Sequence, residues 1–167
     1  MADPVLELRP LAPADVTELR RIRATLEVRR WWGEIEDDFP DGDEPDAVRF
    51  TIAVDGDVAG LIQYYEENEP RYRHASIDIF LDPALRGRGL GAEALRRLVD
   101  LLVRERGHHR ITIDPAVANT PAIRAYEKAG FQCVGVMRDY EREVDSEHWH
   151  DGLLMEYVAP GTPHLDS

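Results

Sequence analysis

The sequence predicts one mixed α/β domain, and three observations lead to this prediction. Segments that alternate apolar and polar residues, as half-buried strands do, are interspersed with segments whose apolar residues recur at helical spacing. The 167 residues fit one domain that can bury a substantial core, so we expect 1–167 to be a single domain. A glycine-rich segment, RGRGLG at 86–91, lies centrally between a strand and a helix.

The N-terminal segment predicts a strand, a helix and a loop. Residues 5–11 alternate as a strand would, and Pro13 suits the first turn of a helix over residues 12–27. The apolar residues expected on one face of that helix are Val16, Leu19, Ile22 and Leu26. Residues 28–48 have no period, and we interpret them as a loop with at most one helical turn. The acidic run 34–46 within it is typical of a solvated face.

Three strands of one sheet follow. Residues 49–54 and 58–67 predict two strands joined by a turn at Asp55-Gly56, and residues 74–82 predict the third. In the third strand, one side should carry Ile77, Ile79 and Leu81, and the other Ser76, Asp78 and Phe80.

After the glycine segment and its helix, residues 110–114 predict a short strand. Thr120 can cap the next helix, with Pro121 in its first turn and Gly130 as its C-terminal stop. Residues 131–137 and 151–158 predict two closing strands around a polar loop. The single cysteine, Cys133, excludes an internal disulfide, and its apolar surroundings predict a small buried strand residue.

Charge and hydropathy exclude several classes of function. The formal charge of −13 argues against nucleic acid as a partner, because phosphate contacts need a basic face, and it permits a cationic substrate. No apolar run is long enough to span a membrane, and the N-terminus has no signal-peptide core. We therefore expect a cytoplasmic protein without a membrane partner, either a monomer or a homodimer.

The glycine segment has the properties of a phosphate site. The first N–H groups of a helix lack partners, and the helix dipole adds positive charge there. Glycines at 87, 89 and 91 remove side chains that would block an anion, and Arg86 and Arg88 add charge. The pattern is neither a P-loop nor G-x-G-x-x-G. The alternative is a plain tight turn into a helix.

The same residues resemble the R/Q-x-x-G-x-G/A motif of the GNAT superfamily of acetyl-CoA-dependent N-acetyltransferases. The segment NTPAIRAYEKAGF, 119–131, resembles a second signature of that superfamily. The resemblance implies a GNAT fold: a central mixed, mostly antiparallel sheet, splayed between its fourth and fifth strands and flanked by helices. Acetyl-CoA would lie in the split and leave CoA as product. The implied cofactor contacts are Ile79, Leu81, Arg86, Gly87, Arg88, Gly89, Leu90, Gly91, Asn119 and Ala122.

Further segments resemble the aminoglycoside N-6′-acetyltransferases: WWGEIED, AGLIQYY, SIDIFL, TIDPAVANTPAIRAYEKAGF and DGLLMEYV. The REVDSEHWH loop has no counterpart. This resemblance implies substrate contacts from Trp31, Trp32, Gln63, Tyr65, Asp78, Asp114 and Asp151. A polyamine on sugar rings needs carboxylates and aromatic faces, which this set supplies.

The implied mechanism assigns catalysis to two residues. Asp78, directly or through a water, would take a proton from the acceptor ammonium, because only a neutral amine attacks. A backbone N–H of the fourth strand would hold the thioester oxygen. Tyr126 would stabilise the leaving thiolate mostly by hydrogen bonding, because a phenol is a weaker acid than a thiol.

Other interpretations remain open. The acceptor could be a polyamine, another small amine or a protein N-terminus, or the domain could bind acyl-CoA for regulation without turnover. Each site residue also has a structural alternative: Trp31 and Trp32 as core, Asp114 and Asp151 as turn formers, and Tyr126 as a packed aromatic. We expect no metal site, because the two histidines of His148-Trp-His150 have no third ligand at suitable spacing.

Overall fold

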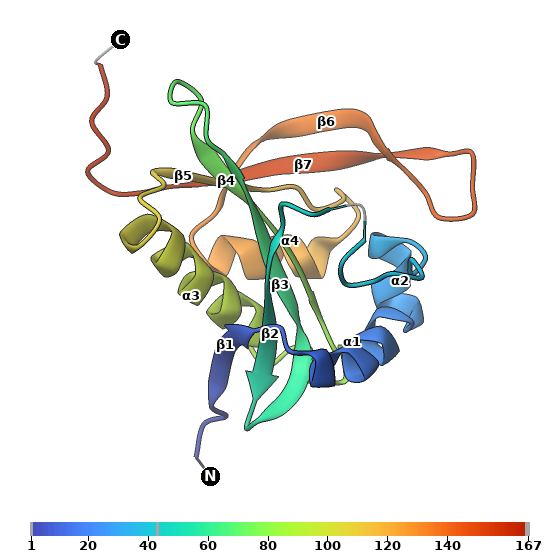
Figure 1. The fold of residues 1–167 in the computed structure, drawn as a ribbon. Helices are drawn as coiled ribbons and strands as arrows, with labels where there is room; N and C mark the ends of the chain where they lie inside the picture. The colour runs from blue at the N-terminus through green and yellow to red at the C-terminus, as the bar shows by residue number, and fades with distance from the viewer. Residues whose placement is uncertain (1, 43, 166–167) are drawn as a thin grey trace.

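The computed structural model describes residues 2–42 and 44–165, which form a seven-stranded mixed sheet (Figure 1). Its spatial order is β1 (Leu6–Pro10), β2 (Val48–Val54), β3 (Asp57–Glu67), β4 (His74–Leu81), β5 (Arg110–Ile113), β7 (Trp149–Val158) and β6 (Gln132–Arg142). All neighbours pair antiparallel except β4 and β5. The predicted fold class is therefore confirmed.

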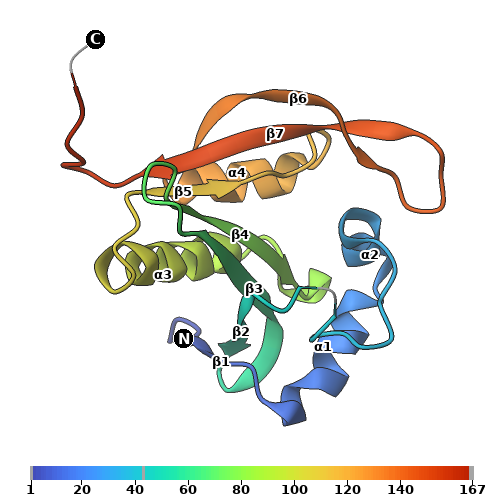
Figure 2. The same cartoon turned by 45° about the horizontal axis from the view of Figure 1, so that its top comes forward.

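Helices cover both faces of the sheet (Figures 1 and 2). They are α1 (Val16–Arg23), α2 (Leu26–Trp32), α3 (Leu90–Arg104) and α4 (Thr120–Lys128), with short 3₁₀ turns η1 (Pro13–Asp15) and η2 (Pro83–Leu85). The main core joins α3 and the end of α4 to the sheet, whereas a smaller core joins α1 and α2 to β3 and β4. As predicted from the alternation in β4, Ile77 packs in the main core and Phe80 in the smaller one.

The sheet is splayed between β4 and β5, as predicted. Only two residue pairs join these strands, Ala75 with Ile111 and Ser76 with Thr112, although β4 continues to Leu81. Figure 2 shows the two strands diverging beyond this pairing. The later part of β4 therefore has a strand partner only on the β3 side.

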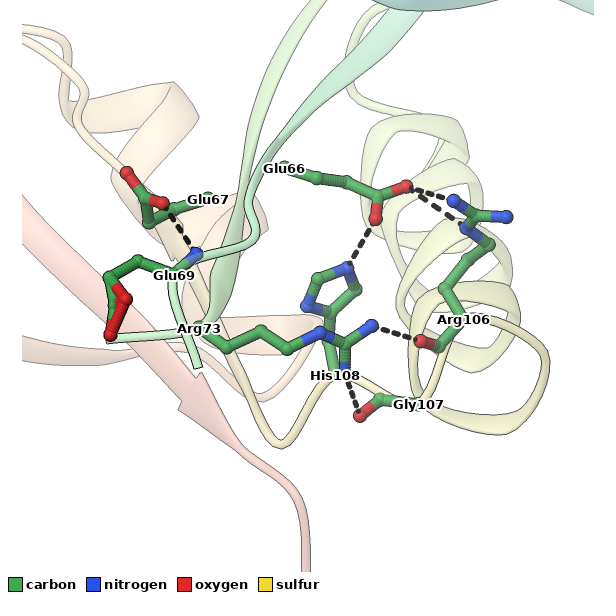
Figure 3. A network of polar contacts seen from close by, with 7 residues as sticks. All are labelled: Glu66, Glu67, Glu69, Arg73, Arg106, Gly107 and His108. Atoms are coloured by element: carbon green, nitrogen blue, oxygen red, sulfur yellow. Dashed lines mark hydrogen bonds and ion pairs between the residues drawn. The ribbon is translucent and has the colours of Figure 1, made fainter. Parts of the chain in front are cut away.

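A polar network anchors the closed end of this split (Figure 3). The carboxylate of Glu66, at the end of β3, accepts hydrogen bonds from Arg106 at 2.9 Å and pairs with the buried His108 ring at 3.1 Å. Arg73 donates to the carbonyls of Arg106 and Gly107. Burial acts to raise the pKa of Glu66, but the hydrogen bonds from Arg106 and His108 outweigh it and keep the pKa below its usual value. The start of β4 is thereby fixed to the α3–β5 turn.

The predicted helix over 12–27 is wrong at its end. Thr25 adopts an extended conformation and its hydroxyl donates to the Ile22 carbonyl at 2.7 Å, so α1 stops and a new helix begins. Leu26, expected on one helical face with Leu19 and Ile22, is 77% exposed, whereas those two residues are buried. The helix α2 then occupies the start of the predicted loop. It is held to α1 by the buried Arg23, whose guanidinium donates to the carbonyls of Trp32 and Gly33.

Three details near the C-terminus also differ from the predictions. Cys133 is exposed rather than buried, because β6 is an edge strand. The N-cap of α4 is Asn119, whose side chain accepts from the Ala122 N–H at 3.4 Å, rather than Thr120. The closing strands extend through much of the expected polar loop, to Arg142 and from Trp149.

In the part of the chain that the structure describes, no helix has the length and apolar character needed to cross a bilayer.

Gly60 provides a test of the close approach of β3 and β4. A β-carbon there would lie 2.2 Å from the Phe80 carbonyl oxygen, so we expect Gly60→Ala to destabilise the fold by about 1–3 kcal/mol. Gly135→Ala, at a strand position with open space, should change stability by less than about 0.5 kcal/mol. Urea unfolding of both variants measures this difference, and equal stabilities would contradict the packing argument.

Candidate active site

A cavity of about 970 Å³ opens where β4 and β5 part, between α4, the turn before α3 and the α2–β2 loop. Fifteen of the residues predicted for the site line it: Trp31, Trp32, Gln63, Asp78, Ile79, Leu81, Arg86, Gly87, Gly89, Leu90, Gly91, Asp114, Asn119, Ala122 and Tyr126. The fold thus brings together residues from distant parts of the chain.

At one end of the cavity, the turn before α3 presents backbone rather than side chains. Gly87 and Gly89 have φ angles of 76° and 75°, a left-handed conformation in which a β-carbon is strained. Gly89 is the N-cap of α3, and no side chain caps the helix. The first N–H groups of α3 are therefore left for an anion, and Arg86 lines the same space.

At the middle of the cavity lies Asp78, on β4 opposite Gln63 of β3. The Gln63 amide nitrogen lies 3.3 Å from an Asp78 oxygen. Burial raises the pKa of the Asp78 carboxyl to about 6, and the charges of Asp114 and Glu44 add to this effect against the lowering influence of Gln63. Asp78 is therefore mostly a carboxylate at neutral pH, yet it binds a proton more readily than an ordinary aspartate.

Tyr126 reaches the cavity from α4, on the other side of the split. Burial raises the pKa of its phenol, and the negative charges of Asp78 and Asp114 raise it further. The phenol therefore keeps its proton at neutral pH, which makes it a hydrogen-bond donor in the cavity.

Aromatic rings and a further carboxylate also line the cavity. Trp32 packs edge-to-face on Phe80, with centroids 4.9 Å apart, so this ring belongs both to the smaller core and to the cavity lining. The Trp31 ring lies 4.5 Å from the guanidinium of Arg30. Asp114, just after β5, accepts a hydrogen bond from the Tyr140 hydroxyl.

Three of the predicted site residues do not line the cavity. Arg88 lies in the glycine turn outside the lining, and Tyr65 instead donates its hydroxyl proton to Glu44. Asp151 accepts the Asp139 N–H at 2.9 Å and so supports the irregular part of β6.

The sequence reasoning missed eight polar residues that line the cavity: the basic Arg23, Arg49, Arg124 and Lys128, and also Glu36, Glu44, Tyr140 and Glu141. The two glutamates before residue 45 belong to the acidic run in the α2–β2 loop, whose composition was the only signal available. Tyr140 and Glu141 belong to the unexpected extension of β6. Among residues 2–42 and 44–165, no three His, Cys, Asp or Glu side chains are grouped so that they could hold a metal ion.

The model of the acetyltransferase (GNAT) family matches residues 13–131, which include the glycine turn, β4 and α4. The chain belongs to the GNAT family. Its use of acetyl-CoA agrees with the cavity, because the glycine turn and the uncapped N-terminus of α3 line it. The residues thus fit this cofactor, which the cavity could hold by its phosphates at the N-terminus of α3.

Similar GNAT proteins act on different amines. The streptothricin acetyltransferase of Streptomyces lavendulae is 33% identical over 77% of this chain and 67% of its own length. The spermidine N(1)-acetyltransferase of Escherichia coli is 28% identical over 93% of this chain and 92% of its own. An aminoglycoside N(6′)-acetyltransferase of Klebsiella pneumoniae is 42% identical, but over only 43% of this chain and 35% of its own.

Solved structures agree in fold. The aminoglycoside acetyltransferase AAC(6′)-Ib in complex with coenzyme A and kanamycin superposes with a TM-score of 0.76 at 24% identity, over 92% of this chain and 95% of its own. At this identity the likeness shows the shared fold alone.

Substitution of Gly89 tests the anion site at α3. Asn and Asp both tolerate the left-handed conformation and have the same shape, so a comparison of Gly89→Asp with Gly89→Asn isolates the charge. We expect the acetyl-CoA KM to be at least about tenfold higher for the Asp variant, because a carboxylate repels phosphate there. Initial-rate kinetics measure it, and equal KM values would mean that the phosphates bind elsewhere.

Proposed function

We propose that the protein transfers the acetyl group of acetyl-CoA to the 6′-amine of an aminoglycoside. The observation that carries the proposal is the charge distribution in the cavity. One end is the N-terminus of α3, and the lining carries five carboxylates, from Glu36, Glu44, Asp78, Asp114 and Glu141. It also carries five basic side chains, from Arg23, Arg49, Arg86, Arg124 and Lys128, of which Arg23 and Arg49 are held by backbone carbonyls. Such a cavity suits a phosphate-bearing donor and a polycationic acceptor. The indole rings of Trp31 and Trp32 also line the cavity; an arginine lies over one face of each, Arg30 and Arg23 respectively, which leaves the opposite face for a sugar ring or an ammonium group.

The residues around the cavity divide the chemistry between them. When bound, acetyl-CoA supplies the activated acetyl group. Asp78, with its pKa of about 6, accepts a proton from the acceptor ammonium and so exposes the amine lone pair. The Tyr126 phenol keeps its proton and donates a hydrogen bond where negative charge develops on the departing sulfur. The part of β4 beyond Ser76 has no β5 partner, so its backbone is free to hold the donor.

A polyamine is the second candidate acceptor. The five carboxylates suit any chain of ammonium groups, and a spermidine N(1)-acetyltransferase of Escherichia coli aligns with 93% of this chain. The two candidates differ in their need for sugar-binding aromatic faces. They share the catalytic roles of Asp78 and Tyr126.

A panel of acceptors distinguishes these functions by the release of free thiol from acetyl-CoA. We expect turnover of kanamycin and tobramycin, which carry a 6′-amine, and no turnover of an aminoglycoside with a 6′-hydroxyl. Spermidine should react with a kcat/KM at least about tenfold lower. A preference for spermidine would favour the second candidate, and thiol release independent of every amine would exclude both.

The pH dependence of the reaction tests the role of Asp78. The general base must be deprotonated, and its pKa of about 6 lies above the ordinary value, so activity should fall as the pH drops below about 6. Asp78→Asn should lower kcat by about 10²–10⁴-fold, and the loss should shrink at high pH, where more amine is already neutral. Profiles of kcat against pH at saturating acetyl-CoA measure both effects.

Asp100→Asn is a suitable control for that experiment, because Asp100 lies on the exposed side of α3 in an ion pair with Arg104. It should keep the wild-type profile. Wild-type kcat in Asp78→Asn at neutral pH would exclude Asp78 as the base.

A further inference from the structure

Glu44 occupies an unusual position in the α2–β2 loop. Its carboxylate accepts hydrogen bonds from the Tyr65 hydroxyl and from the Gln63 amide nitrogen, the latter at 3.2 Å. That same nitrogen lies 3.3 Å from an oxygen of Asp78. The two carboxylate oxygens therefore lie no farther apart than these two distances combined, with one neutral amide between them.

The charge of Glu44 is not neutralised within the protein. Both of its donors, Tyr65 and Gln63, are uncharged, and the ion pairs formed by residues 2–42 and 44–165 do not include this carboxylate. The nearby Arg49 instead donates to the backbone carbonyls of Glu44 and Ala47. The negative charge of Glu44 is felt at Asp78, where it helps to raise the pKa.

Two carboxylates held this close repel each other, and a cation between or beside them relieves the repulsion. Gln63 is buried and fixed on β3, and Tyr65 lies two residues further along the same strand, so both donors stand on the sheet. They hold the loop carboxylate at the cavity wall, where Glu44 is part of the lining. A positively charged group of a ligand could therefore bind beside Glu44 and Asp78 and offset the repulsion between their carboxylates.

We propose that Glu44 binds a second ammonium group of the acceptor while the reacting amine lies at Asp78. This inference rests on the proposed acetylation of an amine, and it specifies the acceptor class as molecules with at least two ammonium groups. Glu44 then selects among acceptors through binding and takes no part in the proton transfer. Tyr65 is a positioning residue: its hydroxyl holds Glu44, and it also hydrogen-bonds with Asp78 and accepts from the Gln63 amide at 2.7 Å.

The test compares a diamine with a monoamine of the same length. For Glu44→Gln, we expect the KM for 1,5-diaminopentane and for kanamycin to rise about ten- to hundredfold, the usual effect of losing a charge-assisted hydrogen bond. The KM for pentylamine and kcat for all three should stay within about twofold of wild type. Tyr65→Phe should shift the diamine KM in the same direction by a smaller factor.

Asp37→Asn serves as the matched control, since this residue lies on the same loop but does not line the cavity. It removes one loop charge and should leave every KM unchanged. An equal KM increase for the monoamine and the diamine in Glu44→Gln would overturn the proposal, because Glu44 would then not recognise a second ammonium group. A loss confined to kcat would also overturn it and place Glu44 in the proton transfer.

Failure of the proposed function gives a different result. Should diamines and spermidine react with the same Glu44 dependence while aminoglycosides do not, the acceptor in the proposed function is wrong and the role of Glu44 stands. Should no amine react, calorimetry on the CoA-saturated protein still decides: wild type should bind 1,5-diaminopentane at least about tenfold more tightly than pentylamine, and Glu44→Gln should lose this difference. Equal affinities in wild type would overturn the inference.

Discussion

The parallel pairing of β4 with β5 ends after Ser76 and Thr112, and the site depends on this early end. Backbone groups of a strand need hydrogen-bond partners, and the unpaired edge of β4 beyond Ser76 offers them to a ligand instead. The pairing can stop so soon because other contacts fix the two strands. Antiparallel β3 pairs along the whole of β4, antiparallel β7 pairs along β5, and the Glu66 network closes the end that remains.

Backbone groups form one end of the cavity, and side chains form the other. The end at α3 consists of backbone N–H groups and glycines, whose geometry the sheet and helix determine. The other end consists of side chains from elements far apart in sequence: Glu44 from a loop, Asp78 from β4 and Tyr126 from α4. Electrostatics couple them at the centre, where burial and neighbouring carboxylates raise the pKa of Asp78. An acceptor cation is favoured there, and its proton has an acceptor of suitable basicity.

Much of the fold and part of the site could be predicted from local patterns. The alternation in β4 correctly gave the two faces of that strand, and the glycine spacing correctly placed a turn before α3. The break between α1 and α2 could not be found in this way, because it depends on one hydroxyl bond from Thr25 and on a buried arginine that a pattern of polarity assigns to solvent.

The position of Glu44 at the cavity was harder to predict for a related reason. Glu44 stands in a segment without periodicity, and its contact with Gln63 spans 19 residues, so only the folded chain reveals the pair. Asp151 shows the converse case: the resemblance selected it, and its carboxylate accepts the Asp139 N–H in the bulged part of β6, so its contact with a substrate stays a prediction. Tyr65 contributes through Glu44 rather than through the cavity surface.

The α2–β2 loop, residues 33–47, has a consequence for how such a protein can diversify. Its described residues, 33–42 and 44–47, include Glu36 and Glu44 at the cavity and form no strand of the sheet, and the glycine turn before α3 lies on a different part of the chain. Substitutions at the exposed positions of this loop can therefore change the cavity wall without changing the sheet or the turn before α3, whereas Phe39 of the loop packs on Phe80 and belongs to the smaller core. In this chain, the loop is where a new acceptor preference would arise at the smallest cost to stability.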